Sequence, residues 1–396
     1  MKTPRTLILL VGSNPLPNLL TARALRPERI ALIHTKETKS MKNRLERILG
    51  KDFEIDPADS FLEDSNSADK VRRIVESLMS PPDGVHLNYT GGTKVMAAHA
   101  LLAFRSAGGK SENASYLDEG GPEGKPRLRF DDGTVLPLID FPELAISPDD
   151  VLSLHDIRPT PREAVEPAPS AEDARTILQA VFEDIDAKLR SSEWRSKRLH
   201  GERKRLEKAK KVKKAIEAPF RPEEFGLELS LPRVPDATDM DKSAFKHWYK
   251  FIGGEWLEEW VAEEIRTIGL EPEPNIMTGV NSKRGEEDRN LEIDIAVFRN
   301  FRTYFISCTT DATKDICKSK LFEIVVRSRH LGGDLARAAL VCLADDKLVG
   351  LFRQDVADIW GASNTTKVFG LEDIRKWAGA DGAPPNRQSL KNWLES

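Results

Sequence analysis

Residues 85–94 read Val-His-Leu-Asn-Tyr-Thr-Gly-Gly-Thr-Lys and are the most informative stretch in the first third of the chain. Val85–Tyr89 predicts a buried strand, and Lys94–Arg105 has helical spacing. The glycine pair between them lets backbone amides approach a ligand closely. Hydroxyl groups and a cation at a helix N-terminus favour an anion such as phosphate. The spacing matches neither GxGxxG nor GxxxxGK[ST], so no particular nucleotide follows. A tight glycine turn with a surface lysine is the alternative.

Strands and helices alternate on both sides of this stretch. The sequence predicts strands at Leu7–Val11, Ile30–His34, Asp52–Ile55 and Ala114–Leu117, helices at Ser40–Leu49 and Ala68–Met79, and a closing hairpin at Arg127–Phe130 and Val135–Leu138. Such alternation predicts a parallel sheet covered on both faces, so residues 1–140 are expected to form a Rossmann-like α/β domain. The loop Gly12–Asn18 is a second candidate ligand loop, because it also follows a strand.

A second α/β domain is predicted over residues 244–396. Its expected elements are a helix around Trp256–Ile265, strands at Leu291–Phe298 and Thr303–Cys308, a helix at Ile316–Arg329 and a strand at Ala338–Leu343. Between the domains, residues 141–243 are expected to be a linker and a basic helical region, with thirteen Lys/Arg against three Glu over residues 188–214. That segment is either a solvated helix face or a rail that guides nucleic acid.

Composition excludes several classes of protein. The 396 residues have a net charge of only −4, so the whole chain is not a generic polyanion binder. Its three cysteines have no CxxC spacing, and its seven histidines lack the paired spacing of a zinc site. No stretch approaches the ~18 apolar residues of a membrane helix. We therefore expect a cytoplasmic chain with no membrane partner.

Carboxylates gather on one predicted strand of the second domain. Alternation along Leu291–Val297 places Glu292 and Asp294 on one face, and two acids there are costly to bury without a partner. The helix Gly253–Val261 supplies Glu258 and Glu259, which could reach the same place. Clustered acids with a lysine are what a metal-dependent nuclease needs. The alternative is that the acidic face points to solvent.

The N-terminal domain resembles the CARF domain, the CRISPR-associated Rossmann fold. Asn88–Met96 is similar to the signature loop of that family, and the segments Ile33–Thr35 and Tyr116–Asp118 also match. The resemblance implies a homodimer that binds a cyclic oligoadenylate, commonly the tetra-adenylate, in a cleft across its two-fold axis. It implies these ligand-binding residues: Gly12, Ser13, Asn14, Pro15, Asn18, Thr35, Asn88, Thr90, Gly91, Gly92, Thr93 and Lys94.

The C-terminal domain resembles the PD-(D/E)XK, or restriction-endonuclease-like, fold of the CARF–nuclease fusions in type III CRISPR systems. The family's Gly-x-Trp-Leu-Glu motif matches Gly254–Glu258, which makes Glu258 the helix acid, and the strand aspartate corresponds to Asp294. The next strand departs from the family, because Ser307–Thr309 replaces Glu-x-Lys. Either the missing groups have moved to the following helix, which carries Lys318, Lys320 and Glu323, or the nuclease fold is inactive.

The resemblance thus implies a cyclic-oligoadenylate-activated, Mg- or Mn-dependent endonuclease of CRISPR antiviral defence that cuts DNA, RNA or both. Asp294 and Glu258 would hold the metal, Glu292 and Glu323 are the further candidate acids, and Lys320 would stabilise charge on the phosphate. The alternatives are a ligand-controlled nucleic-acid-binding or regulatory protein with an inactive nuclease fold, and a ring nuclease that degrades the cyclic signal.

Overall fold

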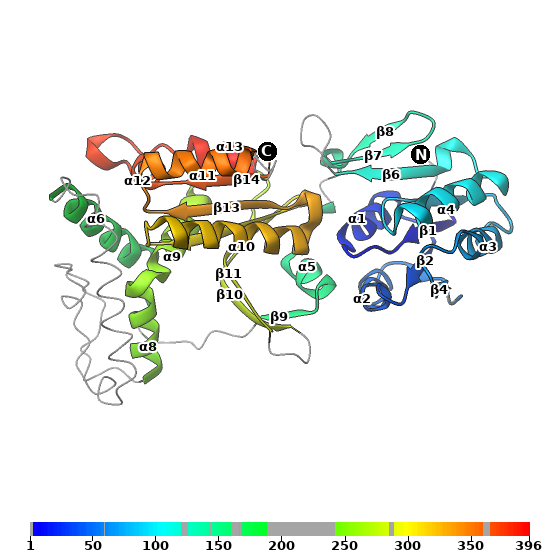
Figure 1. Cartoon of the computed structure of the whole chain (residues 1–396), viewed down its shortest axis with the longest axis horizontal. Helices are drawn as coiled ribbons and strands as arrows, with labels where there is room; N and C mark the ends of the chain where they lie inside the picture. Colours follow the sequence, from blue (N-terminus) through cyan, green and yellow to red (C-terminus); the bar gives the residue numbers. More distant parts are fainter. Residues whose placement is uncertain are drawn as a thin grey trace.

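The computed structural model describes residues 3–58, 60–119, 126–141, 144–159, 166, 168–187, 242–284, 289–358 and 365–396. Two sheets lie side by side in Figure 1, one from the N-terminal part of the chain (blue to cyan) and one that joins the C-terminal strands (yellow to red) to the green strand β9. The basic segment 188–214 lies outside the described residues, so neither interpretation of it is tested. No described helix is both long and apolar enough to cross a membrane.

The first sheet has the order β3-β2-β1-β5-β6-β7-β8, and a short strand, β4, pairs with β2 off this path. Its parallel strands are β1 (Thr6–Leu10), β2 (Arg29–Thr35), β3 (Glu54–Ile55), β4 (Phe61–Leu62), β5 (Val85–Asn88) and β6 (Ala114–Asp118), and the antiparallel hairpin is β7 (Arg127–Phe130) and β8 (Val135–Pro137). The strand order reverses between the neighbours β1 and β5. Such a switch point is where open α/β sheets bind ligands.

Helices cover both faces of this sheet, as the alternation predicts. Leu7 and Leu9 of β1 pack in one apolar cluster with α1 (Leu16–Leu25) and α2 (Lys39–Leu49). Ile8 and Leu10 point the other way and pack with α3 (Ala68–Leu78) and α4 (Lys94–Ser106). Short 3-10 turns at Ser111–Asn113 and Leu138–Asp140 complete the domain.

The second sheet has the order β14-β13-β12-β11-β10-β9. Its strands are β9 (Ile157–Pro159), β10 (Asn275–Arg284), β11 (Arg289–Arg299), β12 (Arg302–Thr309), β13 (Arg337–Cys342) and β14 (Thr366–Phe369). β9 to β12 pair antiparallel, and β12 to β14 pair parallel. The mixed sheet matches the fold class expected from the sequence.

Two groups of helices sandwich the second sheet. One apolar cluster joins one face to α6 (Ala171–Ala187), α8 (Lys242–Lys250), α9 (Trp256–Thr267), α12 (Leu371–Ala378) and α13 (Gln388–Leu394). On the opposite face, α10 (Lys314–Gly332) and α11 (Asp346–Asp358) pack against β13 and β14. A π-helical turn at Phe251–Glu255 joins α8 to α9, and 3-10 turns at Gly333–Leu335 and Ala380–Gly382 follow α10 and α12.

The two domains share an apolar core. A single cluster contains Leu7 of the first sheet together with Phe305 and Ile324 of the second domain. Between them lies α5 (Pro148–Leu154), and the backbone N–H of Ile146 donates to the carbonyl of Asn300 at 2.5 Å. The described part of the expected linker region 141–243 thus contains α5, β9 and α6. The domain boundaries at 140 and 243 stay predictions.

Two expectations about local structure were wrong. The predicted loop Gly12–Asn18 ends early, because α1 begins at Leu16, and β10 precedes the two strands that the sequence indicated. The order in the second domain is therefore helix, three strands, helix, strand.

Candidate functional site

The two N-terminal loops touch each other through glycine backbones. β1 and β5 are parallel neighbours, so the segments that follow them emerge at the same edge of the sheet. A Cβ atom at Gly91 would lie 2.0 Å from the carbonyl oxygen of Leu10, and one at Gly12 would lie 3.1 Å from the backbone nitrogen of Gly92. Only glycine fits at position 91, because a real Cβ would overlap the strand.

Polar side chains fix the end of β5 against β6. The Thr90 hydroxyl accepts a hydrogen bond from the Leu117 N–H at 2.6 Å, and the Asn88 side-chain oxygen accepts one from the Thr90 N–H at 3.2 Å. The Asn88 amide also donates to the Ser115 hydroxyl at 3.2 Å. Asn88 and Thr90 therefore shape the predicted ligand loop in this structure.

The N-terminus of α4 is the exposed part of this loop. Thr93 caps the helix, since its hydroxyl accepts a hydrogen bond from the Met96 N–H at 3.2 Å. Lys94 follows directly and is exposed, as are Gly92 and Ser13 of the neighbouring loop. Backbone amides, a hydroxyl and a cation thus meet solvent together, which suits an anionic ligand.

Like Asn88, three further predicted ligand residues are buried. The Asn18 amide donates to the Leu10 carbonyl at 3.0 Å, while its side-chain oxygen has no hydrogen-bond partner among the described residues. Pro15 is buried beside it, and Thr35 is only 4% exposed at the end of β2. In this structure these three side chains support the loops.

Asn14 of the first candidate loop and Glu119, which follows β6, both reach the second sheet's part of the chain at one turn. A Cβ atom at Gly333 would lie 2.1 Å from the Asn14 amide nitrogen and 3.4 Å from a carboxylate oxygen of Glu119, which follows β6. Glu119 accepts a hydrogen bond from the Asp334 N–H at 3.2 Å. Burial first, and then the charge of Asp334, raise the pKa of Glu119 to about 7. This turn directly follows α10, the helix that carries Lys320.

Asp294 is the centre of the predicted nuclease site. It lies on β11 and is 6% exposed. One carboxylate oxygen accepts hydrogen bonds from the Ser307 hydroxyl at 2.9 Å and from the Cys308 N–H at 2.7 Å. Burial raises the pKa of Asp294, and the charge of Lys320 is the largest effect that lowers it. The strand that lacks Glu-x-Lys therefore still contributes a hydroxyl and an amide.

Lys318 and Lys320, two of the three lysines of α10, differ in their surroundings. Lys320 is close enough to Asp294 for its charge to oppose the effect of burial. Lys318 forms an ion pair with Asp355 of α11 at 2.7 Å. The structure thus brings Lys320, and not Lys318, to the carboxylate.

Glu258 approaches from the first turn of α9. Gly254, which precedes it in the π-helical turn, has φ 156°, and a Cβ there would lie 3.7 Å from the Thr310 hydroxyl just after β12. Burial raises the pKa of the Cys308 thiol, the charges of Asp294 and Glu258 add to that effect, and Lys320 opposes it. The charges of all three groups therefore act on the thiol of Cys308, near the end of β12. π-Helical turns are frequent at functional sites.

The remaining candidate acids lie further out. Glu292 is exposed on β11, and its charge raises the pKa of Asp294. Glu323 forms an ion pair with Arg327 on the same helix, and the Arg327 guanidinium also donates to the carbonyl of Glu292. Glu323 is therefore occupied by a cation rather than turned to Asp294.

The carboxylate oxygens of Asp294 and Glu258 are the kind of ligand that a hard divalent cation prefers. No group of three or more His, Cys, Asp or Glu side chains that could hold a metal occurs among the described residues. A cation here would thus have two protein acids and would complete its coordination with water or substrate oxygens.

Sequence reasoning missed Ser307, Arg327 and Glu119. Ser307 was noted only as a departure from the family, although a hydroxyl opposite Asp294 follows from strand pairing of β11 with β12. Arg327 was detectable as the i+4 partner of Glu323. Glu119 gave no signal, because its contact joins residues 215 positions apart.

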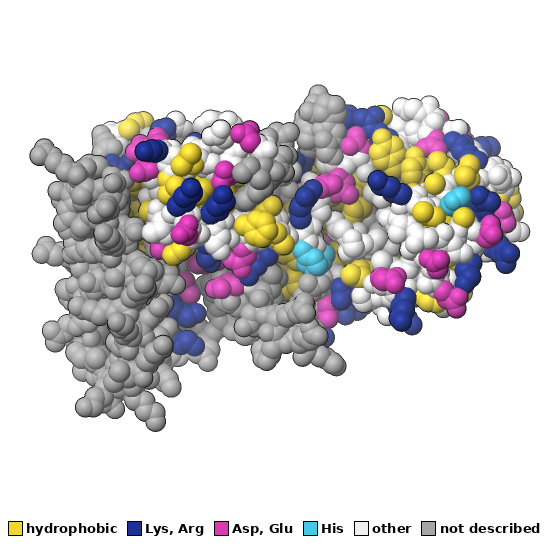
Figure 2. Space-filling view, viewed as in Figure 1, with side chains coloured by type: hydrophobic (Ala, Val, Ile, Leu, Met, Phe, Trp, Pro, Cys, Tyr) yellow, Lys and Arg dark blue, Asp and Glu magenta, His cyan; other side chains and the backbone are white. Residues whose placement is uncertain are grey.

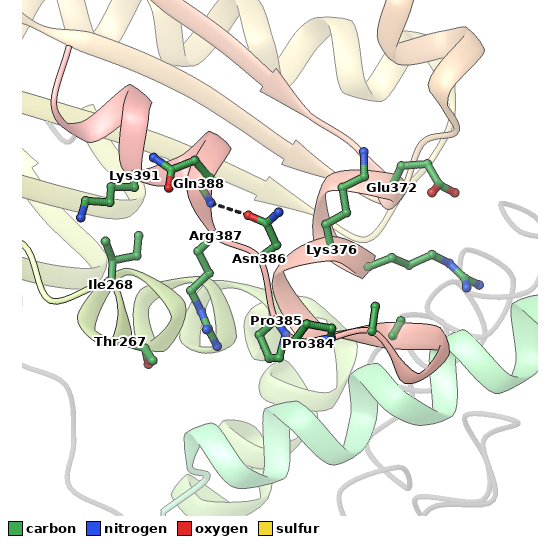
Figure 3. Close-up of a pocket in the computed structure, with 13 residues that line it drawn as sticks. Thr267, Ile268, Glu372, Lys376, Pro384, Pro385, Asn386, Arg387, Gln388 and Lys391 are labelled. Carbon is green, nitrogen blue, oxygen red and sulfur yellow. Dashed lines mark hydrogen bonds between the residues drawn. The ribbon is translucent and has the colours of Figure 1, made fainter.

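A separate cavity of about 800 Å³ lies at the other end of α9 (Figure 3). Lys376, Arg387 and Lys391 line it, but Figure 3 shows Lys376 pointing away from Arg387, and Arg387 is paired with the buried Glu264. Thr267 of this cavity is nine residues from Glu258, which is roughly 13 Å along a helix. The cavity is distinct from the acidic site.

These features define an α/β chain with two sheets, of which the first is a largely parallel, Rossmann-like sheet and the second is a mixed sheet. No protein-family model and no curated protein matches the chain. Solved structures do match it over nearly its whole length. Protein VC1899 from Vibrio cholerae has 16% identity and a TM-score of 0.64, with 98% of each chain covered.

Two further solved structures that match the chain have names that state a ligand or an activity. Can2 from Sulfobacillus thermosulfidooxidans, in complex with cyclic tetra-adenylate, has 16% identity and a TM-score of 0.58 over 92% of this chain and 93% of that one. A type III CRISPR defence DNA nuclease activated by cyclic oligoadenylate has 20% identity and a TM-score of 0.51, over 87% of this chain and 46% of that one. The α/β fold class expected from the sequence is confirmed.

Proposed function

We propose that the chain is a nuclease of type III CRISPR defence that a cyclic oligoadenylate activates. The proposal is carried by the site at the end of β12, where the Ser307 hydroxyl and the Cys308 N–H hold the buried Asp294 carboxylate. The charges of Glu258 and Lys320 act on the thiol of Cys308 at the same place. The complex of Can2 with cyclic tetra-adenylate and the oligoadenylate-activated DNA nuclease, which share the fold, support both halves of the proposal.

Each residue of the site has a distinct task in phosphodiester cleavage. Lys320 would stabilise negative charge that develops on the scissile phosphate. The Ser307 hydroxyl and the Cys308 N–H hold the Asp294 carboxylate in place. A Mg²⁺ or Mn²⁺ ion bound by Asp294 and Glu258 would supply Lewis acidity and lower the pKa of water. Burial raises the pKa of Asp294 and so disfavours the ionised carboxylate. A nearby positive charge opposes this effect, because it favours the ionised form.

The ligand would bind at the switch point of the first sheet. Ser13, Gly92, Thr93 and Lys94 are exposed there, so phosphates would meet amides and an ammonium group. Hydrophobic side chains gather over α4 and α10 on the face shown in Figure 2, and Leu102 and Phe322 are more than half exposed. Apolar surface of this kind suits a second copy of the chain, which the two-fold ligand cleft of the proposed homodimer requires.

A cleavage assay tests the nuclease. Labelled single- and double-stranded DNA and RNA are incubated with and without cyclic tetra-adenylate and with Mg²⁺, Mn²⁺ or EDTA. Asp294→Asn and Lys320→Ala should each lower the activated rate by about 100-fold or more. Lys318→Ala on the same helix is the matched control and should stay within about two-fold, since it loses only a partly exposed ion pair. Full activity of Asp294→Asn would refute the site.

A ligand-controlled binding protein with an inactive nuclease fold is the second candidate. The observation that favours it is Ser307 in place of the expected acid, together with only two acids at the metal position among the described residues. Ligand-dependent nucleic-acid binding without cleavage on any substrate would establish this function. A ring nuclease would linearise cyclic tetra-adenylate. Chromatography of that ligand after incubation therefore distinguishes a ring nuclease from both the nuclease and the binding protein.

A further inference from the structure

Three arginines lie together on one face of the second sheet, at the end where β11 turns into β12. Arg299 of β11 and Arg302 of β12 are direct partners in the antiparallel register, so their side chains point to the same face. Arg337 of β13 is the register partner of Tyr304, which is two residues along β12 from Arg302 and therefore shares that face as well. The fold thus brings together guanidinium groups from three neighbouring strands.

These cations are buried or half-buried, and none of them forms an ion pair with a carboxylate of the described residues. Arg302 and Arg337 are each 4% exposed. The three guanidinium groups donate instead to neutral main-chain carbonyls, which are those of Leu394 and Glu271 for Arg299, of Leu335 for Arg302, and of Asp334 and Ala336 for Arg337. Carbonyl oxygens accept hydrogen bonds but do not neutralise three positive charges.

Each of the three guanidinium groups also has a donor to spare. The Nε atoms of Arg299 and Arg337 and one terminal nitrogen of Arg302 are buried and have no hydrogen-bond partner among the described residues. A buried charged donor without an acceptor is costly, and like charges on opposite strand positions repel. Burial lowers the pKa of Arg302 to about 10, and the charge of Arg337 adds to this effect. An anion that accepts these hydrogen bonds would therefore stabilise the cluster.

The acids near the cluster are directed elsewhere. Burial lowers the pKa of Arg337, and the charge of Asp334 is among the effects that oppose this, but the Asp334 side chain is 70% exposed and pairs with Arg329 at 3.5 Å. Burial raises the pKa of Tyr304, and the charge of Glu395 adds to this, but Glu395 is exposed. Neither acid forms an ion pair with the three arginines.

A cavity of about 520 Å³ borders the cluster. It is lined by Trp393 and by Thr366 of β14, whose register partner Ala338 directly follows Arg337. The ring of Trp393 packs edge-on against Tyr304, with ring centroids 5.2 Å apart. The indole N–H of Trp393 is a further buried donor that has no partner in the described part of the chain. The cavity therefore offers a small ligand an approach to this end of the sheet.

We propose that Arg299, Arg302 and Arg337 form a binding site for a multivalent oxyanion of the phosphate class. Guanidinium groups bind phosphate oxygens through paired N–H donors, and three positive charges favour a dianion over chloride or a single carboxylate. The site is separate from the predicted nuclease site, because Ser307, which holds Asp294, lies five residues further along β12, or roughly 17 Å. It does not depend on the proposed nuclease function.

Calorimetry of the full chain with inorganic phosphate tests this site. The parent should bind phosphate, and Arg302→Met and Arg337→Met should each weaken the affinity by about 10-fold or more, because each removes a charge-assisted donor pair. Arg299→Met changes the least buried of the three arginines and should have the same effect, which keeps the test valid if the other two variants do not fold. Arg29→Met removes an arginine that pairs with Glu54 in the first sheet, and as the matched control it should stay within about two-fold.

Melting temperatures distinguish a ligand site from a purely structural cluster. Phosphate stabilises proteins in general because it is excluded from their surface, so the quantity compared is the gain in melting temperature from chloride to phosphate at equal ionic strength. That gain should be larger in the parent and in Arg29→Met than in Arg302→Met, since a ligand that binds only the folded chain stabilises it. Equal gains in all three proteins would overturn the proposal.

A final titration distinguishes free phosphate from a phosphate group on a larger ligand. Adenosine monophosphate is compared with inorganic phosphate on the parent and on Arg302→Met. Binding of the nucleotide that Arg302→Met weakens would assign a phosphate monoester, and binding of inorganic phosphate alone would assign the free ion; both results uphold the site. A parent that binds no phosphate, or an affinity for phosphate that is unchanged in all three variants of the cluster, would refute it.

Discussion

Replacement of Glu119 by glutamine should remove a pH dependence from the domain interface. Glu119 of the first domain accepts a hydrogen bond from the Asp334 N–H at the turn after α10. Burial raises its pKa from an ordinary value of 4.5 to about 7, and the charge of Asp334 adds to this. Asp334 is itself paired with Arg329 at 3.5 Å. Glutamine keeps an oxygen acceptor for the Asp334 N–H but carries no charge.

The sign of the effect follows from the raised pKa. Below pH 4.5 the carboxyl is protonated in the folded and unfolded chain, so its contribution to stability is fully present. As pH rises from 4.5 through about 7, the unfolded chain loses the proton first, and that contribution is lost. A displacement of this size corresponds to about 3 kcal/mol at full burial, and the partial exposure of Glu119 reduces it to roughly 2 kcal/mol.

Chemical unfolding of both proteins at pH 5, 6, 7 and 8 provides the measurement. The free energy of unfolding of the parent should fall, relative to Glu119→Gln, by roughly 2 kcal/mol between pH 5 and pH 8. The difference between the two curves isolates this carboxyl, because all other groups titrate in both proteins. Parallel curves across the whole range would refute the argument that Glu119 is buried against Asp334.

Three further changes probe contacts elsewhere in the chain. Gly333→Ala should destabilise the chain by about 2 kcal/mol or more in thermal unfolding, because its Cβ would overlap the Asn14 amide. The control is Gly382→Ala, which also has a positive φ but has nothing within 4 Å of its Cβ, and it should cost only about 1 kcal/mol. Equal losses of stability in the two variants would exclude the overlap. Gly91→Ala should abolish binding of cyclic tetra-adenylate in calorimetry, because its Cβ would meet a strand carbonyl at 2.0 Å. Circular dichroism should show that α4 stays folded. An unchanged affinity for the ligand would mean that this loop does not bind it. Asp150→Ala should cost about 2 kcal/mol in urea unfolding, since it removes the two-pronged pair with Arg23 and a helix cap, and a loss below about 0.5 kcal/mol would contradict this.

Strongly periodic segments were the part of the fold that sequence could predict. β1 and β2 are short, mostly apolar runs buried on both faces, and α3 has one apolar face, so each of them carries its own signal. α1 was missed because it is buried nearly all round, so it shows no polar face, and because it has a proline in its first turn. β10 was missed because polar residues dominate its sequence, and its place in the sheet comes from pairing with β11.

The candidate site likewise contains some residues that the sequence could predict and some contacts that it could not. Strand alternation indicated Asp294, and helix spacing indicated Lys320, because both patterns are local. The ion pair that occupies Glu323 also follows from local spacing, but the bond from Arg327 to a backbone carbonyl 35 residues away does not. A hydrogen bond to a main-chain atom does not depend on the type of the accepting residue, so it cannot be predicted from the sequence pattern. Only the tertiary structure shows it.

The shared core has a thermodynamic consequence. Because Leu7 of the first sheet packs in one cluster with Phe305 of the second, neither domain can melt without exposing apolar surface of the other. Any ligand that binds the folded first domain would therefore also raise the free energy of unfolding of the second domain. One apolar cluster thus couples the stability of the two parts of the chain.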